Sequence, residues 1–159
     1  MVEVTGSTQD DLTQLVAEKK ASNGDVIATE FQSAGRGRLG HRWADTGEQG
    51  LAATFVVHTQ SPDRLSLAAA VATATALRSI SRPDVAARIG VKWPNDIVVA
   101  RTGGEPQKIA GILIEGHGDR ALIGIGINVG QSVFEKEIAD RAISLLQLAQ
   151  PRDRLAVLV

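Results

Sequence analysis

The second half of this chain contains four short extended segments that follow one another with only turn residues between them. They span residues 87–92, 97–100, 109–116 and 121–129. The residues that separate them are good turn formers, namely Pro-Asn-Asp at 94–96, Gly-Gly at 103–104 and Gly-Asp at 118–119. Consecutive short strands joined by tight turns predict a meander.

The first half alternates between extended and helical patterns. The expected order is strand, helix, strand, strand and helix, over residues 2–5, 8–21, 25–32, 51–58 and 61–80. Ser7 or Thr8 can cap the first helix, and the alanine-rich body of the second predicts close packing against a sheet. Residues 134–149 fit either a helix or an irregular segment. Because this order is neither a regular βαβ alternation nor an all-β sandwich, we expect an α+β fold, with helices packed on a mixed, largely antiparallel sheet.

Composition is typical of one soluble globular domain. The chain has 159 residues, 43% of them hydrophobic, and a net charge of −1, so residues 1–159 are expected to form a single domain around one core. The charge balance lacks the basic footprint of a nucleic-acid binder, and the absence of cysteine excludes disulfides and thiolate metal sites. We find no signal peptide or bilayer-spanning segment, so we expect no membrane partner and a cytoplasmic location. Residues 152–159 have the pattern of a helix that has just begun, because they finish in an apolar run with no helix-terminating residue. This pattern suggests that the chain is truncated there.

Residues 35–43, Gly-Arg-Gly-Arg-Leu-Gly-His-Arg-Trp, form the densest polar motif of the chain. Glycine lets the backbone approach a ligand closely, and guanidinium groups offer paired donors to phosphate or carboxylate oxygens. The segment also matches the dinucleotide fingerprint G-x-G-x-x-G, but that motif must open a helix, whereas residues 41–50 have a loop-like composition. We therefore interpret it as an arginine loop that closes over an anionic ligand, with a solvated basic loop as the alternative.

Three further motifs follow the arginine loop. They are Lys-Trp-Pro-Asn-Asp at 92–96, Lys-Ile-Ala-Gly-Ile-Leu-Ile-Glu at 108–115 and Gly-Ile-Gly-Ile-Asn at 124–128. Each has an ordinary structural reading when taken alone: a hairpin turn, a strand with an edge lysine, and a strand packed closely through its glycines. No Ser/His/Asp or metal-ligand cluster is evident, so hydrolytic chemistry is not indicated.

Taken together and in this order, the four motifs resemble those of the biotin protein ligase family, and the resemblance covers nearly the whole chain from residue 2. It implies the catalytic domain of that family, with a class II synthetase-like fold shared with lipoate ligases, and without the N-terminal winged helix and C-terminal β-barrel that some members carry. The implied activity is that of a biotin–[biotin carboxyl carrier protein] ligase. Biotin is activated by ATP to biotinyl-5′-adenylate with release of pyrophosphate, and is then transferred to a lysine of a carrier protein.

The resemblance also implies roles for individual residues. The catalytic residues would be Lys108, Arg38 and Arg36. Biotin would be bound by Ser7, Thr8, Gln9, Gln32, Gly35, Arg36, Gly37, Arg38, Lys108 and Gly111. The nucleotide would be bound by Arg38, Arg42, Trp43, Asn95, Lys108 and Asn128. Mg²⁺, which ATP chemistry normally needs, would be positioned by Asp96.

The implied partner is a biotin carboxyl carrier protein, a subunit of acetyl-CoA carboxylase or of another biotin-dependent carboxylase. A homodimer is compatible with the resemblance, because a sheet edge serves for dimer or carrier contact in many relatives. Three alternatives stay open. They are a lipoate or octanoate ligase of the same fold, a truncated or degenerate ligase that holds biotin without turnover, and a DNA-binding regulator, which the missing basic patch disfavours.

Overall fold

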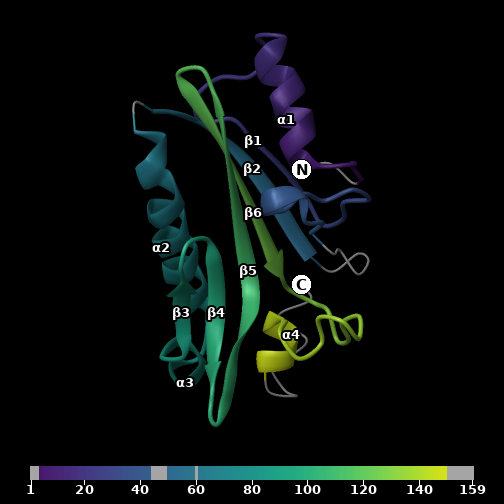
Figure 1. The fold of residues 1–159 in the computed structure, drawn as a ribbon, viewed down its shortest axis with the longest axis vertical. Helices are drawn as coiled ribbons and strands as arrows, with labels where there is room; N and C mark the ends of the chain where they lie inside the picture. The colour runs from purple at the N-terminus through teal and green to yellow at the C-terminus, as the bar shows by residue number, and fades with distance from the viewer. Residues whose placement is uncertain (1–3, 44–49, 60, 150–159) are drawn as a thin grey trace.

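The centre of the protein is a six-stranded sheet in which every pair of neighbouring strands is antiparallel (Figure 1). A computed structural model describes residues 4–43, 50–59 and 61–149. The strand order is β1-β2-β6-β5-β4-β3. The strands are β1 (Val26–Thr29), β2 (Gly50–His58), β3 (Ile89–Lys92), β4 (Asp96–Arg101), β5 (Gly104–His117) and β6 (Arg120–Asn128). The helices are α1 (Thr8–Ala17), the 3-10 turn η1 (Arg38–Gly40), α2 (Pro62–Ile80), α3 (Pro83–Ala86) and α4 (Leu145–Leu148).

The predicted meander is confirmed, because β3, β4, β5 and β6 pair in sequence order. β5 is longer than expected and begins at Gly104, directly after a tight turn in which Gly103 has a φ of 71°. The segment predicted as a strand from residue 87 begins only at Ile89, because Pro83 starts the one-turn helix α3 before it. The α+β class is confirmed, and parallel pairing among the described residues is limited to isolated bridges such as Thr5–Gln32.

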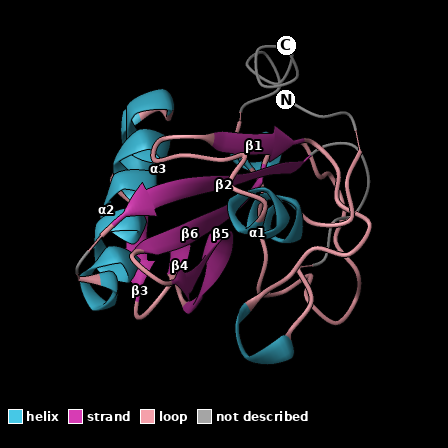
Figure 2. Ribbon diagram, turned by 90° about the horizontal axis from the view of Figure 1, so that it is seen from above, coloured by secondary structure: helices cyan, strands magenta, loops and turns pink. Residues whose placement is uncertain are grey.

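The two long helices pack on opposite faces of the sheet (Figure 2). Successive residues of a strand point to opposite faces, and on β6 the buried Leu122 belongs to the core cluster of α1 while Ile123 belongs to that of α2. The predicted alanine-rich contact is present, since Ala70 and Ala74 of α2 are almost fully buried against the sheet. Gly124 and Gly126 share the face of Leu122 by the same alternation, so the glycines of β6 face the α1 side.

Several local predictions need correction. α1 ends at Ala17 rather than near residue 21, because Lys19 adopts a left-handed conformation with a φ of 57°. Ser7 is the N-cap residue, but its side chain makes no capping hydrogen bond. For residues 134–149, of the two readings left open the irregular one holds, because the segment is mainly irregular and ends in the short helix α4, where Ser144 and Gln147 form a capping box.

Two expected elements lie at the ends of the chain. Of the strand at 2–5, only Val4 and Thr5 are described, and the final helix at 152–159 lies outside the described residues. The single domain over 1–159 stays a prediction. No helix in the described part of the chain combines the length and apolar character needed to cross a bilayer.

Candidate active site

The motifs singled out in the sequence meet on the α1 face of the sheet, around one cavity. Its walls come from the start of α1, the segment after β1, the arginine loop, the β3–β4 turn, and strands β2, β5 and β6. The predicted site residues that line it are Ser7, Thr8, Gln9, Gln32, Arg36, Gly37, Arg38, Trp43, Asn95, Lys108 and Gly111. The sequence therefore predicted most of this lining, although the residues are spread over more than one hundred positions of the chain.

One end of the cavity is a buried polar network. Gln32 Oε1 accepts hydrogen bonds from the backbone nitrogen and the hydroxyl of Thr8, at 2.8 and 3.1 Å. The Thr8 hydroxyl lies 2.9 Å from that of Thr54, which donates to Gln9 Oε1 at 3.3 Å. Ser7 Oγ is also buried, but it has no hydrogen-bond partner. A buried polar atom of this kind is costly unless a ligand satisfies it.

The arginine loop is held over the cavity by ion pairs and hydrogen bonds. The Arg36 guanidinium contacts Asp10 of α1 at 2.5 Å and also pairs with Glu115 of β5. The hydrogen bond to Asp10, with further support from Glu115, holds the pKa of Arg36 above its ordinary value, so its charge persists at every physiological pH. Arg38 Nη1 donates to Asn95 Oδ1 at 3.1 Å, which joins the loop to the β3–β4 turn.

Trp43 closes the cavity against two glycines. Gly111 and Gly126 are direct partners across β5 and β6, and a Cβ atom placed on them would lie 2.8 and 2.6 Å from the indole ring. The indole ring can occupy this position only because both residues lack a side chain. The free volume of the cavity is about 60 Å³. Gly35 does not line the cavity, but its carbonyl accepts a hydrogen bond from the Trp43 backbone at 2.9 Å.

Lys108 lies at the junction of this cavity with a second hollow, and it lines both. Its ammonium is 2.6 Å from Asp96 Oδ1 and 5.4 Å from the centre of the Trp43 ring, within range of a cation–π contact. Its backbone pairs with the segment before α4, because its amide donates to the Arg141 carbonyl at 2.7 Å and its carbonyl accepts from Ile143 at 3.0 Å. Lys108 is thus a half-buried cation on a firmly held backbone.

The second hollow has a volume of about 470 Å³ and contains the remaining predicted nucleotide and metal residues. Arg42, Asp96 and Asn128 line it together with Trp43 and Lys108. The Asn128 amide donates to the carbonyls of Lys108 and Ile143, at 3.2 and 3.1 Å. Asn128 therefore also braces the Lys108 backbone, a role that its position at the end of a glycine-containing strand does not reveal. Among the described residues, no group of three or more acidic or histidine side chains could by itself hold a metal ion.

The sequence model of the biotin/lipoate A/B protein ligase family matches residues 1–132. The chain belongs to this family.

Individual members of the biotin/lipoate ligase family are similar over nearly the whole chain. The biotin–[acetyl-CoA-carboxylase] ligase of Mycobacterium tuberculosis is 38% identical, over 98% of this chain and 59% of the relative. A biotin protein ligase from Aquifex aeolicus, solved with biotin and ATP, has a TM-score of 0.70 and 31% identity, over 99% of this chain and 63% of that chain. The Leishmania major enzyme with biotinyl-5-AMP has a TM-score of 0.69 and 26% identity, over 98% and 69%. The chain thus spans only 59% of the length of the curated relative.

Sequence reasoning missed several residues of this family member's site. Thr54 lies within an apolar strand and belongs to no motif. The one sequence signal for its position in the cavity is that it lies two residues from Ala52, on the same face of β2. Glu115 ended a recognised motif without a role, and it accepts hydrogen bonds from both Gln9 and Arg36. Asp10 pairs with Arg36, and it belongs to none of the four motifs. The roles of all predicted site residues stay predictions.

Proposed function

We propose that this chain is the catalytic domain of an ATP-dependent biotin–protein ligase. The observation that carries the proposal is the position of Lys108 between two spaces, a cavity with a polar end and a hollow lined by basic side chains. A ligase must bring a carboxylate and a nucleotide phosphate together, and a cation between their binding spaces can neutralise both. The relatives named as biotin ligases support the same activity.

In the first step a carboxylate oxygen of biotin attacks the α-phosphorus of ATP. The bond from that phosphorus to the bridging oxygen breaks, and pyrophosphate leaves with the electron pair. Such a step needs alignment and charge neutralisation more than a proton acceptor. Lys108 and Arg38 supply positive charge, while Arg36, tied to Asp10 and Glu115, keeps the loop closed and water out.

In the second step the amine of a carrier lysine attacks the acyl carbonyl of the adenylate. AMP leaves, an amide forms, and the amine gives up a proton. We propose a biotin carboxyl carrier protein as the acceptor and the cytoplasm as the location, since the reaction consumes ATP. The homodimer and the absence of a nucleic-acid partner stay predictions.

The polar end of the cavity favours biotin over lipoate. The ureido group of biotin carries N–H and C=O groups that need buried partners, whereas the dithiolane ring of lipoate has none. Thr8, Gln32 and the unpartnered hydroxyl of Ser7 supply such partners. Lipoate would leave the hydroxyl of Ser7 without a partner.

The residues of the second hollow also fit Mg²⁺. This ion usually binds through one or two carboxylates together with substrate phosphates, and Asp96 is a half-buried carboxylate in the hollow. When bound, Mg²⁺ would neutralise phosphate charge. The chain itself holds Asp96 beside Lys108, so that the Asp96 carboxylate and the Lys108 ammonium form an ion pair until the nucleotide binds.

The test is biotin-dependent release of pyrophosphate from Mg-ATP by the purified protein, with lipoate as the comparison substrate. We expect release with biotin only, reduced about 100-fold or more in Lys108→Ala and Arg38→Ala. Biotin binding by calorimetry without any release would instead identify a module that holds biotin without turnover. Pyrophosphate release with lipoate in place of biotin would identify the chain as a lipoate ligase of the same family.

A further inference from the structure

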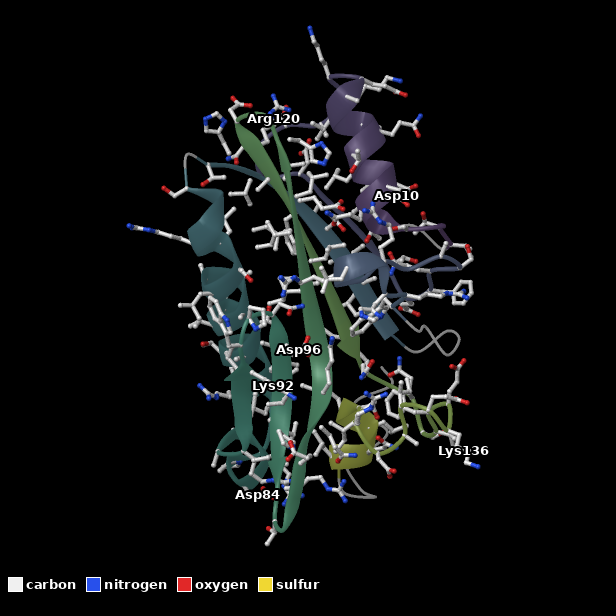
Figure 3. The ribbon with its side chains drawn as sticks, viewed as in Figure 1. Asp10, Asp84, Lys92, Asp96, Arg120 and Lys136 are labelled. Carbon is white, nitrogen blue, oxygen red and sulfur yellow. The ribbon has the colours of Figure 1, made fainter. Side chains whose placement is uncertain are left out.

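A hollow of about 630 Å³ lies on the α2 side of the sheet, and the function described so far gives it no task. Its walls come from β2, β6, α2, α3 and the chain around α4, and apart from Ser81 and Arg82 every lining residue is aliphatic. We call it the apolar hollow. It lies at the end of the molecule that Asp84 of α3 marks in Figure 3, since the next residue, Val85, lines it.

The apolar hollow opens into the hydrophobic core and is separate from the active site. Leu51 and Ile127, direct partners across β2 and β6, both line it, and Ile127 packs on the core cluster beneath α2. Neighbouring residues of a strand face opposite sides, so Asn128 faces the active site while Ile127 faces the hollow. Leu145 and Leu148 of α4 also line it and are only half-buried. Aliphatic surface left open in this way gains free energy when another apolar group covers it.

The chain continues from the rim of this hollow. Ala149, the last residue that the structure describes, is part of the lining, and residues 150–159 follow it. Ten extended residues reach up to about 33 Å, so a segment tethered at the rim can fold back over the hollow. A short tether gives its segment an effective concentration in roughly the millimolar range, which favours it over a separate partner molecule.

The sequence of the tethered segment matches an apolar site. Leu155, Leu158 and Val159 are spaced i, i+3 and i+4, so in a helix they share one face. The charged residues 152–154 come before them, and Pro151 is well suited to the first turn of a helix. The segment therefore has one apolar face and begins beside an apolar hollow.

We propose that residues 155–159 dock into the apolar hollow as a helical segment, with Leu155, Leu158 and Val159 against the aliphatic side chains of α2, α3 and α4. The segment then completes the core on the α2 side, directly behind the end of β6 that carries Asn128. Docking of this segment does not depend on the proposed ligase function. A second copy of the chain and a small apolar molecule are the competing occupants of the hollow.

The absence of cysteine from the chain allows a direct test with single thiols. Ile80 lines the apolar hollow and is 71% exposed, while Val71 on the same helix is 51% exposed and does not line it. A thiol at either position reacts with a maleimide at a rate that follows its accessibility. When the segment covers the hollow, Ile80→Cys should react about tenfold or more slowly than Val71→Cys. This is the reverse of the order that the two exposed fractions predict.

Two matched substitutions, each added to Ile80→Cys, identify the occupant. Leu155→Asp places a charge on the proposed docking face. Val157→Asp places the same charge on the opposite face, because residues two positions apart do not share a helix face. We expect the reaction rate to rise to that of Val71→Cys with Leu155→Asp and to stay low with Val157→Asp. Leu155→Ala, which removes apolar surface without adding a charge, should change the rate in the same direction as Leu155→Asp.

The contrary results are equally definite. Fast reaction of Ile80→Cys in the otherwise unaltered chain would overturn the proposal, and equal rates with Leu155→Asp and Val157→Asp would overturn the assigned docking face. Slow reaction that persists with Leu155→Asp would mean a different occupant, which is a second copy if dilution speeds the reaction and a bound apolar molecule if it does not. Because no substrate is present, the ligase function is tested separately, by pyrophosphate release.

Discussion

Lys108 and Gly111 project from the same face of β5, although they stand three residues apart. In a regular strand such residues point to opposite faces. Here Lys108 pairs with Val98 and Gly111 with Asp96, so Ile109 is the extra residue of a β-bulge without a partner on β4. The bulge turns Lys108 into the cavity that Gly111 also lines, and a Cβ atom on Gly111 would lie 2.9 Å from Lys108 Nζ.

This relationship makes Gly111→Ala a sensitive probe of catalysis. The added methyl group would collide with the ends of the Lys108 and Trp43 side chains rather than with backbone. We expect the variant to fold, while biotin-dependent pyrophosphate release falls about 100-fold, because small displacements of a catalytic group cost that much. Gly116→Ala on the same strand is the control, since nothing lies within 4 Å of its added methyl. Equal activity in the two variants would mean that Lys108 does not need its observed position.

The unpartnered hydroxyl of Ser7 predicts a gain of stability at the expense of binding. Removing a buried hydroxyl that has no partner relieves a desolvation cost, so Ser7→Ala should raise the free energy of unfolding without ligand by about 1 kcal/mol. Its affinity for biotin should fall about tenfold, because a hydrogen bond to the ligand is lost. Chemical denaturation and calorimetry measure the two quantities.

Ser144 provides the contrast to Ser7. It is equally buried, but its hydroxyl donates to the Gln131 carbonyl at 2.6 Å and accepts from the Gln147 backbone nitrogen. Ser144→Ala should therefore destabilise the protein by about 1–2 kcal/mol and leave biotin affinity unchanged. Loss of stability in Ser7→Ala as large as in Ser144→Ala would refute the ligand-facing role of Ser7.

Glu115→Gln tests whether Arg36 holds the loop closed. Glutamine keeps the shape and can still accept a hydrogen bond from Gln9, but it removes the ion pair with Arg36. Because Arg36 is partly exposed, the effect on unfolding should stay below about 1 kcal/mol. Biotin should dissociate several-fold faster in stopped-flow measurements. Asp84→Asn, which removes an exposed ion pair with Arg82 remote from the cavity, should leave that rate unaltered.

Asp96→Asn tests the proposed metal ligand. The substitution keeps the size of the side chain but removes its negative charge, so the Mg²⁺ concentration for half-maximal pyrophosphate release should rise several-fold. A titration with Mg²⁺ at saturating ATP measures the change. Asp119→Asn, in the exposed turn between β5 and β6, is the charge-matched control. An unchanged Mg²⁺ requirement in Asp96→Asn would place the ion elsewhere.

Much of the fold was predictable from local pattern. The turn residues at 94–96, 103–104 and 118–119 mark each reversal of the meander, and short, largely apolar segments mark the strands between them. The one-turn helix α3 and the early end of α1 were missed, because single residues, Pro83 and Lys19, decide them. The residues that line the cavity were predicted mainly from the four motifs. Thr54 was not predicted, because it belongs to none of them.

By itself, the sequence determined which chemical groups this protein has and in which order they come along the strands and turns. Glycine-bearing strands, an arginine loop and a lysine at the start of an apolar strand can all be recognised from residue type and spacing alone. Only the tertiary structure decided which of these groups face one another. The bulge at Ile109 reverses the alternation that would turn Lys108 away from Gly111. The pairing of Gly111 with Gly126 makes the flat surface on which Trp43 rests. Register and bulges depend on contacts between strands that are distant in sequence, and no local pattern specifies them.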